Sequence, residues 1–252
     1  MEIQNQVEDI MLDRHYKSHH VVSLLLDQCA DELESLLAEQ FGEGPHVDAI
    51  RRRIDKLMGP KEIERKRVEL DQYVAQRLDA LKEQFAHREV HIVPLLEPAP
   101  TISMPLDPLQ KIVDGLIKNA IENTPDEGKI VISVGPQEDG AEFAVHDYGV
   151  GIIAEAQRHI FDGFFATQDT MAYSSKRAFD FNAGGKGADL LRMKIFSERY
   201  NLKIEMTSTR CRYIPTESDI CPGKISECPH CTNKRDCYAS GETTFTIRFP
   251  PA

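Results

Sequence analysis

The N-terminal part of the chain carries apolar residues at alternating steps of three and four, the spacing that places them along one side of a helix. One such seam is formed by Val22, Leu26, Cys29, Leu33 and Leu36. A second seam, beyond the break at Gly59-Pro60, is formed by Leu70, Val74, Leu78, Leu81 and Phe85. Long helices with one narrow seam cannot bury it alone. We therefore expect residues 1–88 to form a helical hairpin that dimerises as a four-helix bundle; the alternative is that these helices pack on a globular domain of the same chain.

From about residue 89 the apolar residues change to the alternation that is typical of strands. Alternation at 90–92 predicts an edge strand, and a loop rich in proline follows it. Further strands are predicted at 129–134, 142–146, 202–207 and 243–249. Helical spacing predicts one helix that starts at Asp107-Pro108, with Asp107 as its N-cap, and another over about 189–200. This mixture predicts an α+β fold in which residues 89–252 form an α/β sandwich, with helices on one face of a mainly antiparallel sheet.

The chain is acidic, with 30 Lys and Arg residues against 41 Asp and Glu residues and a formal net charge of -11. Such a charge does not attract nucleic-acid backbones or anionic membranes, so we exclude both as main partners. No stretch approaches the roughly 20 consecutive apolar residues that a membrane span requires. The N-terminus is polar and acidic, unlike a secretory signal, and we expect a cytoplasmic protein.

Two features interrupt the apolar pattern of the predicted sandwich. Asn119 lies in the middle of an otherwise apolar helix. Because a buried amide needs partners, this residue is either a satisfied core residue or part of a binding site. The segment Asp147-Tyr148-Gly149-Val150-Gly151 directly follows a strand. Its glycines allow the backbone to approach a flat ligand and its carboxylate can accept from an exocyclic amine; a plain glycine-rich turn is the alternative.

Two further features follow along the chain. An aromatic cluster at 161–167 precedes a polar stretch at 168–182, and its aromatic rings either hinge a mobile lid or belong to the core. The run Gly184-Gly185-Lys186-Gly187 opens a predicted helix. Free amides at a helix N-terminus bind phosphate, and glycine permits the close approach. The four features in this order favour a nucleotide-binding site.

These motifs carry a resemblance to a known family. LIKNAIENTPDEG, which begins at Leu116, is similar to the N box of sensor histidine kinases, and DYGVGI, IFDGFFAT and GGKGADL are similar to their G1, F and G2 boxes. The ending GETTFTIRFP is similar to their closing strand. Residues from about 68 to 250 therefore resemble the ATP-binding catalytic domain that these kinases share with gyrase, Hsp90 and MutL.

The resemblance implies ATP and Mg²⁺ as cofactors. It implies that Asn119 holds the Mg²⁺, that Asp147 binds the adenine amino group, and that Gly149 and Gly151 shape the pocket. The other nucleotide-binding residues that it implies are Asn123, Phe165, Thr167, Gly185, Lys186 and Gly187. An acidic protein binds a triphosphate by pairing it with a metal and oriented amides, which agrees with this set.

The resemblance also implies an activity, that of an autophosphorylating histidine kinase in a two-component signalling system. The γ-phosphate of ATP would pass to a His on the helical hairpin of a homodimer, and then to an Asp in the receiver domain of a response regulator. His19 is the first candidate for the phosphoacceptor, followed by His15 and His20. The alternative is that these are exposed helical histidines without chemistry.

Three positions depart from the family's pattern. Gly115 stands where an Asn or an acidic residue is common, Glu122 where a Lys is common, and Asp189 where the last Gly of the G2 box is expected. Asp189 places a negative charge near the phosphates, where it either weakens ATP binding or helps to hold a metal or a lid cation such as Lys176 or Arg177. These departures favour a second hypothesis, a catalytically weak or inactive regulatory scaffold that senses ATP or a metal.

Cysteine usage points to a metal. Of the 6 Cys residues, all but Cys29 lie in a predicted insertion at 211–239, between the last two strands. The core of the insertion reads Cys221-x6-Cys228-x2-Cys231-x5-Cys237. Four thiolates around one ion would order a segment that is poor in apolar residues, and disulfides are disfavoured in a reducing cytoplasm. The expected ligand is Zn²⁺ or an iron–sulfur cluster, and uncoordinated thiols are the alternative.

Overall fold

The computed structural model describes residues 64–138, 140–161, 177–183, 188–216 and 219–252. These residues belong to one compact unit, Glu64–Ala252. Residues 1–63 carry the first predicted helix together with His15, His19 and His20, and they lie outside the described residues. The dimerising hairpin and its phosphoacceptor therefore stay predictions.

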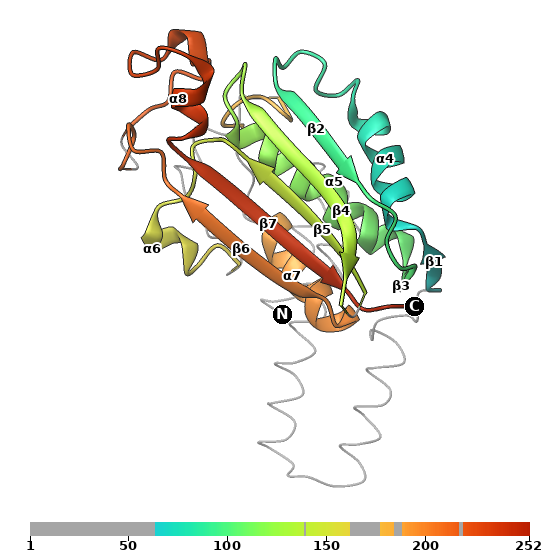
Figure 1. Cartoon of the computed structure of the whole chain (residues 1–252). Coiled ribbons are helices and arrows are strands. Elements are labelled where there is room, and N and C mark those ends of the chain that lie inside the picture. The colour runs from blue at the N-terminus through green and yellow to red at the C-terminus, as the bar shows by residue number, and fades with distance from the viewer. Residues whose placement is uncertain (1–63, 139, 162–176, 184–187, 217–218) are drawn as a thin grey trace, which may run out of the picture. The chain divides into compact units, whose positions relative to one another are not determined.

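A five-stranded sheet forms the centre of the unit, with the strand order β2-β4-β5-β7-β6 (Figure 1). Its strands are β2 His91–Leu96, β4 Lys129–Gln137, β5 Gly140–Asp147, β6 Lys203–Thr209 and β7 Glu242–Phe249. Three of the four pairings are antiparallel, and β2 pairs with β4 in parallel. The predicted mainly antiparallel sheet is confirmed. β2 is longer than predicted and includes Pro94, which an edge strand tolerates because one of its sides needs no hydrogen-bonded neighbour.

Alternation along the central strands directs every second side chain into the core. On β5, Phe143 and Val145 are buried, whereas the intervening Ala144 and the following His146 are only half-buried. Three helices cover the buried face of the sheet (Figure 1). They are α4 Leu70–Leu81, α5 Leu106–Asn123 and α7 Ala188–Tyr200. The mixed architecture thus agrees with the α/β sandwich that the sequence predicts.

Helix α5 is the central helix of this layer. Its buried apolar residues are Leu109, Ile112, Val113, Leu116, Ile117, Ala120 and Ile121. The predicted start at Asp107 is wrong, because the helix begins at Leu106 with Pro105 in the N-cap position and without a side-chain cap. Asp107 instead lies in the first turn, where its carboxylate pairs with Lys111 at 2.7 Å.

Helix α4 belongs to the core of the sheet unit, although the sequence pattern places it with the helical region that ends at residue 88. Its residues Leu70, Val74 and Leu81 are buried in the same hydrophobic cluster as α5 and the central strands. The seam of α4 is therefore covered by the sheet unit itself. A small antiparallel sheet of β1 Lys66–Val68 and β3 Ile102–Met104, which the sequence does not predict, closes the same end of the unit.

In the described residues between β6 and β7, the structure contains two short elements. They are a single turn of 3₁₀ helix, η2 Ile225–Glu227, and the helix α8 Lys234–Tyr238. Another short helix, α6 Ala154–Gln157, follows the glycine-rich segment after β5. The described part of the chain thus consists of a regular sandwich with one irregular addition at the β6–β7 end (Figure 1).

Candidate functional site

A buried carboxyl group ends β5. Asp147 is 3% exposed, and its Oδ1 accepts a hydrogen bond from the amide of Gly149 at 3.1 Å. Burial, with a smaller contribution from the charge of Glu242, raises the pKa of Asp147 from 3.8 to about 8, because the backbone donors do not offset the loss of water around the charge. A carboxyl group held in this way at the end of a strand is poised to gain a further hydrogen-bond partner.

The two glycines after Asp147 are required by close packing. A Cβ atom on Gly149 would lie 2.2 Å from the carbonyl oxygen of Asn123, and one on Gly151 would lie 1.9 Å from the carbonyl oxygen of Thr209. Gly151 also has a φ of 64°, in the left-handed region. The amide of Val150 donates to the Asn123 carbonyl at 3.0 Å. The loop therefore rests directly on the end of α5.

The last turn of α5 presents two asparagines. Asn119 is half-buried and Asn123 is exposed, one helical turn further along. The Asn123 side-chain amide donates to the Asn119 carbonyl at 2.8 Å, and the Thr124 hydroxyl donates to the Ala120 carbonyl at 2.7 Å as the helix ends. Asn119 is therefore not a fully buried core amide. Its side chain lies on the helix whose end carries the Asp147 loop.

Glu122 faces the interior. It is 2% exposed, its Oε1 accepts from the amide of Phe179 at 3.0 Å, and its carbonyl accepts from the amide of Asn182 at 2.6 Å. Phe179 and Asn182 both have positive φ angles, 71° and 56°. Lys118 lies 3.7 Å from the same carboxylate. This departure from the family's pattern thus anchors the segment 177–183, which leads towards the glycine motif at 184–187.

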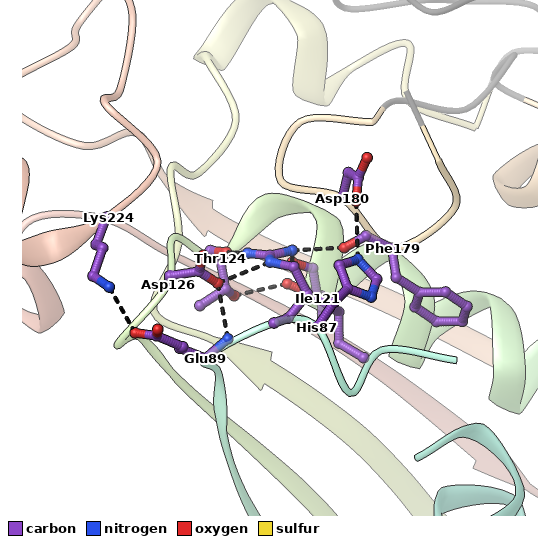
Figure 2. Close-up of polar contacts among 10 residues, drawn as sticks. His87, Glu89, Ile121, Thr124, Asp126, Phe179, Asp180 and Lys224 are labelled. Atoms are coloured by element: carbon purple, nitrogen blue, oxygen red, sulfur yellow. Dashed lines mark hydrogen bonds and ion pairs between the residues drawn. The ribbon is translucent and has the colours of Figure 1, made fainter. Parts of the chain in front are cut away.

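Arg88 joins three parts of the site, a role that the sequence does not reveal. Its side chain is 4% exposed, and its Nε donates to Asp126 Oδ1 at 2.8 Å. Its terminal nitrogens donate to the carbonyl oxygens of Ile121, Thr124 and Phe179 (Figure 2). Arg88 therefore connects the start of β2 with the end of α5 and with the segment 177–183.

A neighbouring contact extends this connection. His87 Nε2 lies 2.9 Å from Asp180 Oδ1 (Figure 2). The backbone amide of Arg177 and the His87 contact both hold the pKa of Asp180 below its usual range. The sequence signal for this network is the polar run at 87–89 beside a predicted strand, and such a run is typical of any surface turn.

A second departure from the family's pattern, Gly115, is explained by helix packing. A Cβ atom at this position would lie 2.8 Å from the terminal methyl group of Met193, on α7. Met193 is 1% exposed. A larger side chain at 115 would displace this contact, so the residue serves the contact between α5 and α7.

The cysteines of the insertion come together. Cys211, Cys221, Cys228, Cys231 and Cys237 line one cavity of about 220 Å³, and all five are free thiols. Burial raises the pKa of Cys237 to about 12, with a further contribution from the neighbouring thiols. Burial and a hydrogen bond with Cys228 raise the pKa of Cys231 to about 11. In the described ranges, no group of three or more His, Cys, Asp or Glu side chains is already arranged to hold a metal ion.

The chain was compared with known protein families. Residues 105–252 match the family model of the histidine kinase-, DNA gyrase B- and HSP90-like ATPases. The chain belongs to this family. The resemblance inferred from the four motifs is thereby confirmed, and the unit Glu64–Ala252 is referred to below as the ATPase unit.

Curated proteins that the chain resembles are sensor kinases. The phosphate regulon sensor protein PhoR of Pseudomonas aeruginosa is 26% identical over 119 residues, which are 47% of this chain and 25% of PhoR. The histidine protein kinase SaeS of Staphylococcus aureus is 29% identical over 103 residues, which are 40% of this chain and 27% of SaeS. The matches thus span a minor part of these longer relatives.

Solved structures share the fold of the ATPase unit. The catalytic domain of histidine kinase ThkA is 17% identical with a TM-score of 0.50, and the match covers 75% of this chain and 96% of that domain. Full-length ShkA in complex with AMPPNP is 17% identical with a TM-score of 0.53, and the match covers 90% of this chain and 46% of ShkA.

In the described part of the chain, no helix has the length and apolar character of a membrane span.

The structure thus describes part of the predicted nucleotide site. Asn123 and Gly149 are in direct contact through the backbone, Asp147 is bonded to Gly149, and Asn119 lies one turn away. The predicted site residues that lie outside the described ranges are His19, Phe165, Thr167, Gly185, Lys186 and Gly187. Lys176 and the side chain of Asp189 also lie outside them.

Proposed function

We propose that the ATPase unit binds ATP with Mg²⁺ at the end of α5 and β5. The observation that carries this proposal is the buried carboxyl group of Asp147 beside a loop in which Gly149 and Gly151 leave no room for a side chain. A carboxylate in this place accepts from the adenine amino group, and the glycine backbone offers a flat surface for the base. Membership of the family supports the same assignment.

The residues of α5 suit the phosphate end of the nucleotide. The side-chain oxygen of Asn119 is a suitable ligand for Mg²⁺, which supplies charge neutralisation to the phosphates when it is bound. Asn123 lies one turn further, next to the Asp147 loop. Gly185 and Gly187 would donate backbone amides to the phosphates, with Lys186 as a cation, while Phe165 and Thr167 would close the site. Because the net charge is -11, such local donors must offset the repulsion of a triphosphate.

We further propose that the chain is a cytoplasmic histidine kinase of a two-component system, active as a homodimer. The γ-phosphoryl group would pass from ATP to a nitrogen of His19, and then to an Asp of a response-regulator receiver domain. Catalysis would consist mainly of positioning and charge neutralisation. The family match and the sensor kinases among the relatives support this assignment.

Labelling with ATP tests the kinase activity. The purified full chain is incubated with γ-labelled ATP and Mg²⁺, and the labelled protein is treated with acid and with alkali. An acid-labile, alkali-stable label is expected, as for phosphohistidine. Asn119→Ala should abolish the label, whereas the matched amide variant Gln110→Ala, on an exposed part of α5, should retain it.

Variants of the histidines locate the phosphoacceptor. His19→Ala should abolish the label, while His15→Ala and His20→Ala should keep it. If the label survives in His19→Ala, another residue is the acceptor. If the wild-type chain binds ATP but gains no label, the kinase assignment fails, and the regulatory scaffold that senses ATP or a metal takes its place.

A further inference from the structure

The five thiols come from separate parts of the insertion and meet in one place. Cys211 follows the end of β6, Cys221 precedes η2, and Cys237 lies on α8. Between them, Cys228 and Cys231 are held in one tight turn, because the Cys231 amide donates to the Cys228 carbonyl at 3.3 Å. All five thiols border the same cavity of about 220 Å³. This convergence of side chains that are far apart in sequence requires a physical reason.

The apolar residues of the insertion do not supply that reason. Among its described residues, Ile214 and Ile225 are the buried large hydrophobics, whereas Ile220 is 84% exposed. Tyr213 stacks on His230 with ring centroids 5.0 Å apart at the edge of the cavity. So small a core does not hold a segment of this length in one shape, and natural domains of this kind rely on metals or disulfides. The described cysteines form no disulfide.

Local hydrogen bonds orient the thiols at the second half of the insertion. Asn233 and Asp236 form a reciprocal capping box that starts α8. This box lies directly between Cys231 and Cys237, and it therefore fixes the spacing of the two thiols. The Ser240 hydroxyl lies 2.7 Å from the Cys237 carbonyl and 3.3 Å from the Cys211 sulfur. Both ends of the insertion are thus brought to the cavity.

One side of the insertion is attached to the Asp147 loop. The Cys211 amide donates to the Val150 carbonyl at 3.0 Å, and the Arg210 guanidinium donates to the Gly151 carbonyl at 3.1 Å. A Cβ atom on Gly241 would lie 2.8 Å from both Cys211 and the Gly149 carbonyl. The backbone of Cys211 is therefore bonded directly to the glycine loop of the proposed nucleotide site.

The other side of the insertion is attached to the loop that follows α5. The Asp126 amide donates to the Gly223 carbonyl at 2.8 Å, and the Ile225 amide donates back to the Asp126 carbonyl at 3.1 Å. Lys224 also pairs with Glu89 at 2.8 Å (Figure 2). Asp126 is the residue that accepts from Arg88. The segment between Cys221 and Cys228 thus docks on the polar network at the end of α5.

We propose that the five thiols form a binding site for a thiophilic metal centre, either one Zn²⁺ ion or an iron–sulfur cluster, and that its occupancy fixes the Asp147 loop and the 124–128 loop in place. Thiolates are the shared donor chemistry of both centres. Four thiolates are enough to coordinate either centre. The spacing in the sequence predicts four of these cysteines, and the structure adds Cys211, which lines the same cavity. Coordination would draw the thiols inward by rotation of their side chains, because no three of them in the described ranges are already arranged around one point.

The metal site is tested with Zn²⁺ alone on the full chain. Protein stripped with a chelator and then reloaded with Zn²⁺ should keep about one Zn²⁺ per chain after gel filtration, and the metal should protect the thiols of the insertion from a thiol reagent. The double variant Cys228→Ser/Cys231→Ser leaves three thiols at the cavity and should lose the bound metal, and the matched variant Cys29→Ser should keep it. Metal retained equally by both variants, or a wild type that neither retains Zn²⁺ nor forms a cluster on reconstitution, overturns the proposal.

A second arm distinguishes the two centres. Anaerobic reconstitution with iron and sulfide should give visible absorption that depends on the same cysteines if the site holds a cluster. Zn²⁺ binding without such absorption assigns the ion alone. Circular dichroism of each variant verifies that the ATPase unit is folded, so that loss of metal is not confused with unfolding.

Hydrogen exchange tests the connection to the two loops. In the metal-loaded chain, the amides of Asp126 and Cys211 should exchange more slowly, on the order of tenfold, than in the chelated chain. Amides in the β4–β5 pairing serve as the control and should not change. Equal exchange at Asp126 and Cys211 in both forms overturns the proposed coupling.

The consequence for nucleotide affinity rests on the proposed function. A fluorescent ATP analogue should bind the metal-loaded chain more tightly, on the order of tenfold. Unchanged affinity in both forms overturns this extension. If neither form binds the analogue, the proposed nucleotide site fails, whereas metal retention and exchange at the two loops decide the metal proposal independently.

Discussion

Replacement of Asp147 by Asn tests the electrostatics of the proposed adenine pocket. The change keeps the shape of the side chain and an oxygen that can accept from the Gly149 amide. It removes the ionisation whose pKa burial raises from 3.8 to about 8. Because the folded protein holds this proton more tightly than the unfolded chain does, the wild-type protein loses stability as the pH rises through that window.

The magnitude follows from the two pKa values. Between pH 5 and pH 8 the unfolded Asp is already ionised, whereas the folded one must be ionised at a cost. The free energy of unfolding of the wild type should therefore fall by about 3 to 4 kcal/mol over this range, relative to the Asp147→Asn variant. Above pH 8, where Asp147 is ionised, ATP affinity should also fall on the order of tenfold in the variant, because a neutral amide is a weaker acceptor than a carboxylate.

Urea unfolding at several pH values measures this difference. The chain contains no Trp, so unfolding is followed by far-UV circular dichroism. Asp79→Asn, at an exposed position, is the control, and its free energy of unfolding should change with pH in the same way as that of the wild type. A constant difference between wild type and Asp147→Asn from pH 5 to pH 8 would refute the reasoning, since it would mean that Asp147 ionises in the folded state as it does in water.

Three further substitutions test the packing and polar contacts of the site. Gly149→Ala should lower the free energy of unfolding by about 1 to 3 kcal/mol and abolish ATP-analogue binding, because its Cβ would lie 2.2 Å from the Asn123 carbonyl. Arg88→Met should lower the free energy of unfolding by about 3 to 5 kcal/mol, because the half-buried Asp126 carboxylate and three carbonyl oxygens lose their buried donor. Glu122→Ala should lower it by about 1 to 3 kcal/mol, since the buried amide of Phe179 loses its acceptor, and proteolysis should then cleave faster near 177–183. Urea unfolding measures all three changes.

Each of these substitutions has a matched control. Gly135→Ala places its Cβ 4.0 Å from the nearest atom, so it should change stability little. Arg77→Met removes a half-buried pair with Asp114 and should cost about 1 kcal/mol, less than the loss of Arg88. Glu122→Gln keeps an acceptor for the Phe179 amide and should stay near the wild type. Equal losses in a test variant and its control contradict the corresponding argument.

Local patterns predict much of this fold because helices and strands each place their apolar residues at a regular spacing along the chain. The spacing of buried residues on α5 and the alternation of buried residues on β5 are sufficient to predict these two elements. The predicted N-cap of α5, Asp107, is two residues too late, because Asp107 and Pro108 also suit the first turn of a helix, and only the extended conformation of Pro105 shows where the helix begins. The pairing of β1 with β3 brings together two segments of three residues each, too short to show a period.

The site is predictable where it is contiguous in sequence and not where it is assembled from distant parts. Asp147, Gly149 and Gly151 follow directly from one motif, and their place in the nucleotide site stays a prediction. The partners of Arg88 are mainly backbone carbonyl oxygens, which every residue has, so no side-chain pattern marks them. The role of Glu122 cannot be predicted from the sequence for the same reason, because its partner is the backbone amide of Phe179. Cys211 lies ten residues before Cys221, and only the folded insertion brings it to the other thiols.

The insertion leaves and re-enters the sheet at facing positions. Thr209 is the last residue of β6 and Glu242 is the first of β7, and the two are direct partners in the antiparallel register. A short hairpin turn would therefore close the same two strands without shifting any pair. Evolution could gain, lengthen or remove the thiol-bearing segment while the remaining architecture stays in register, so that one ATPase framework can acquire different accessory segments at this junction.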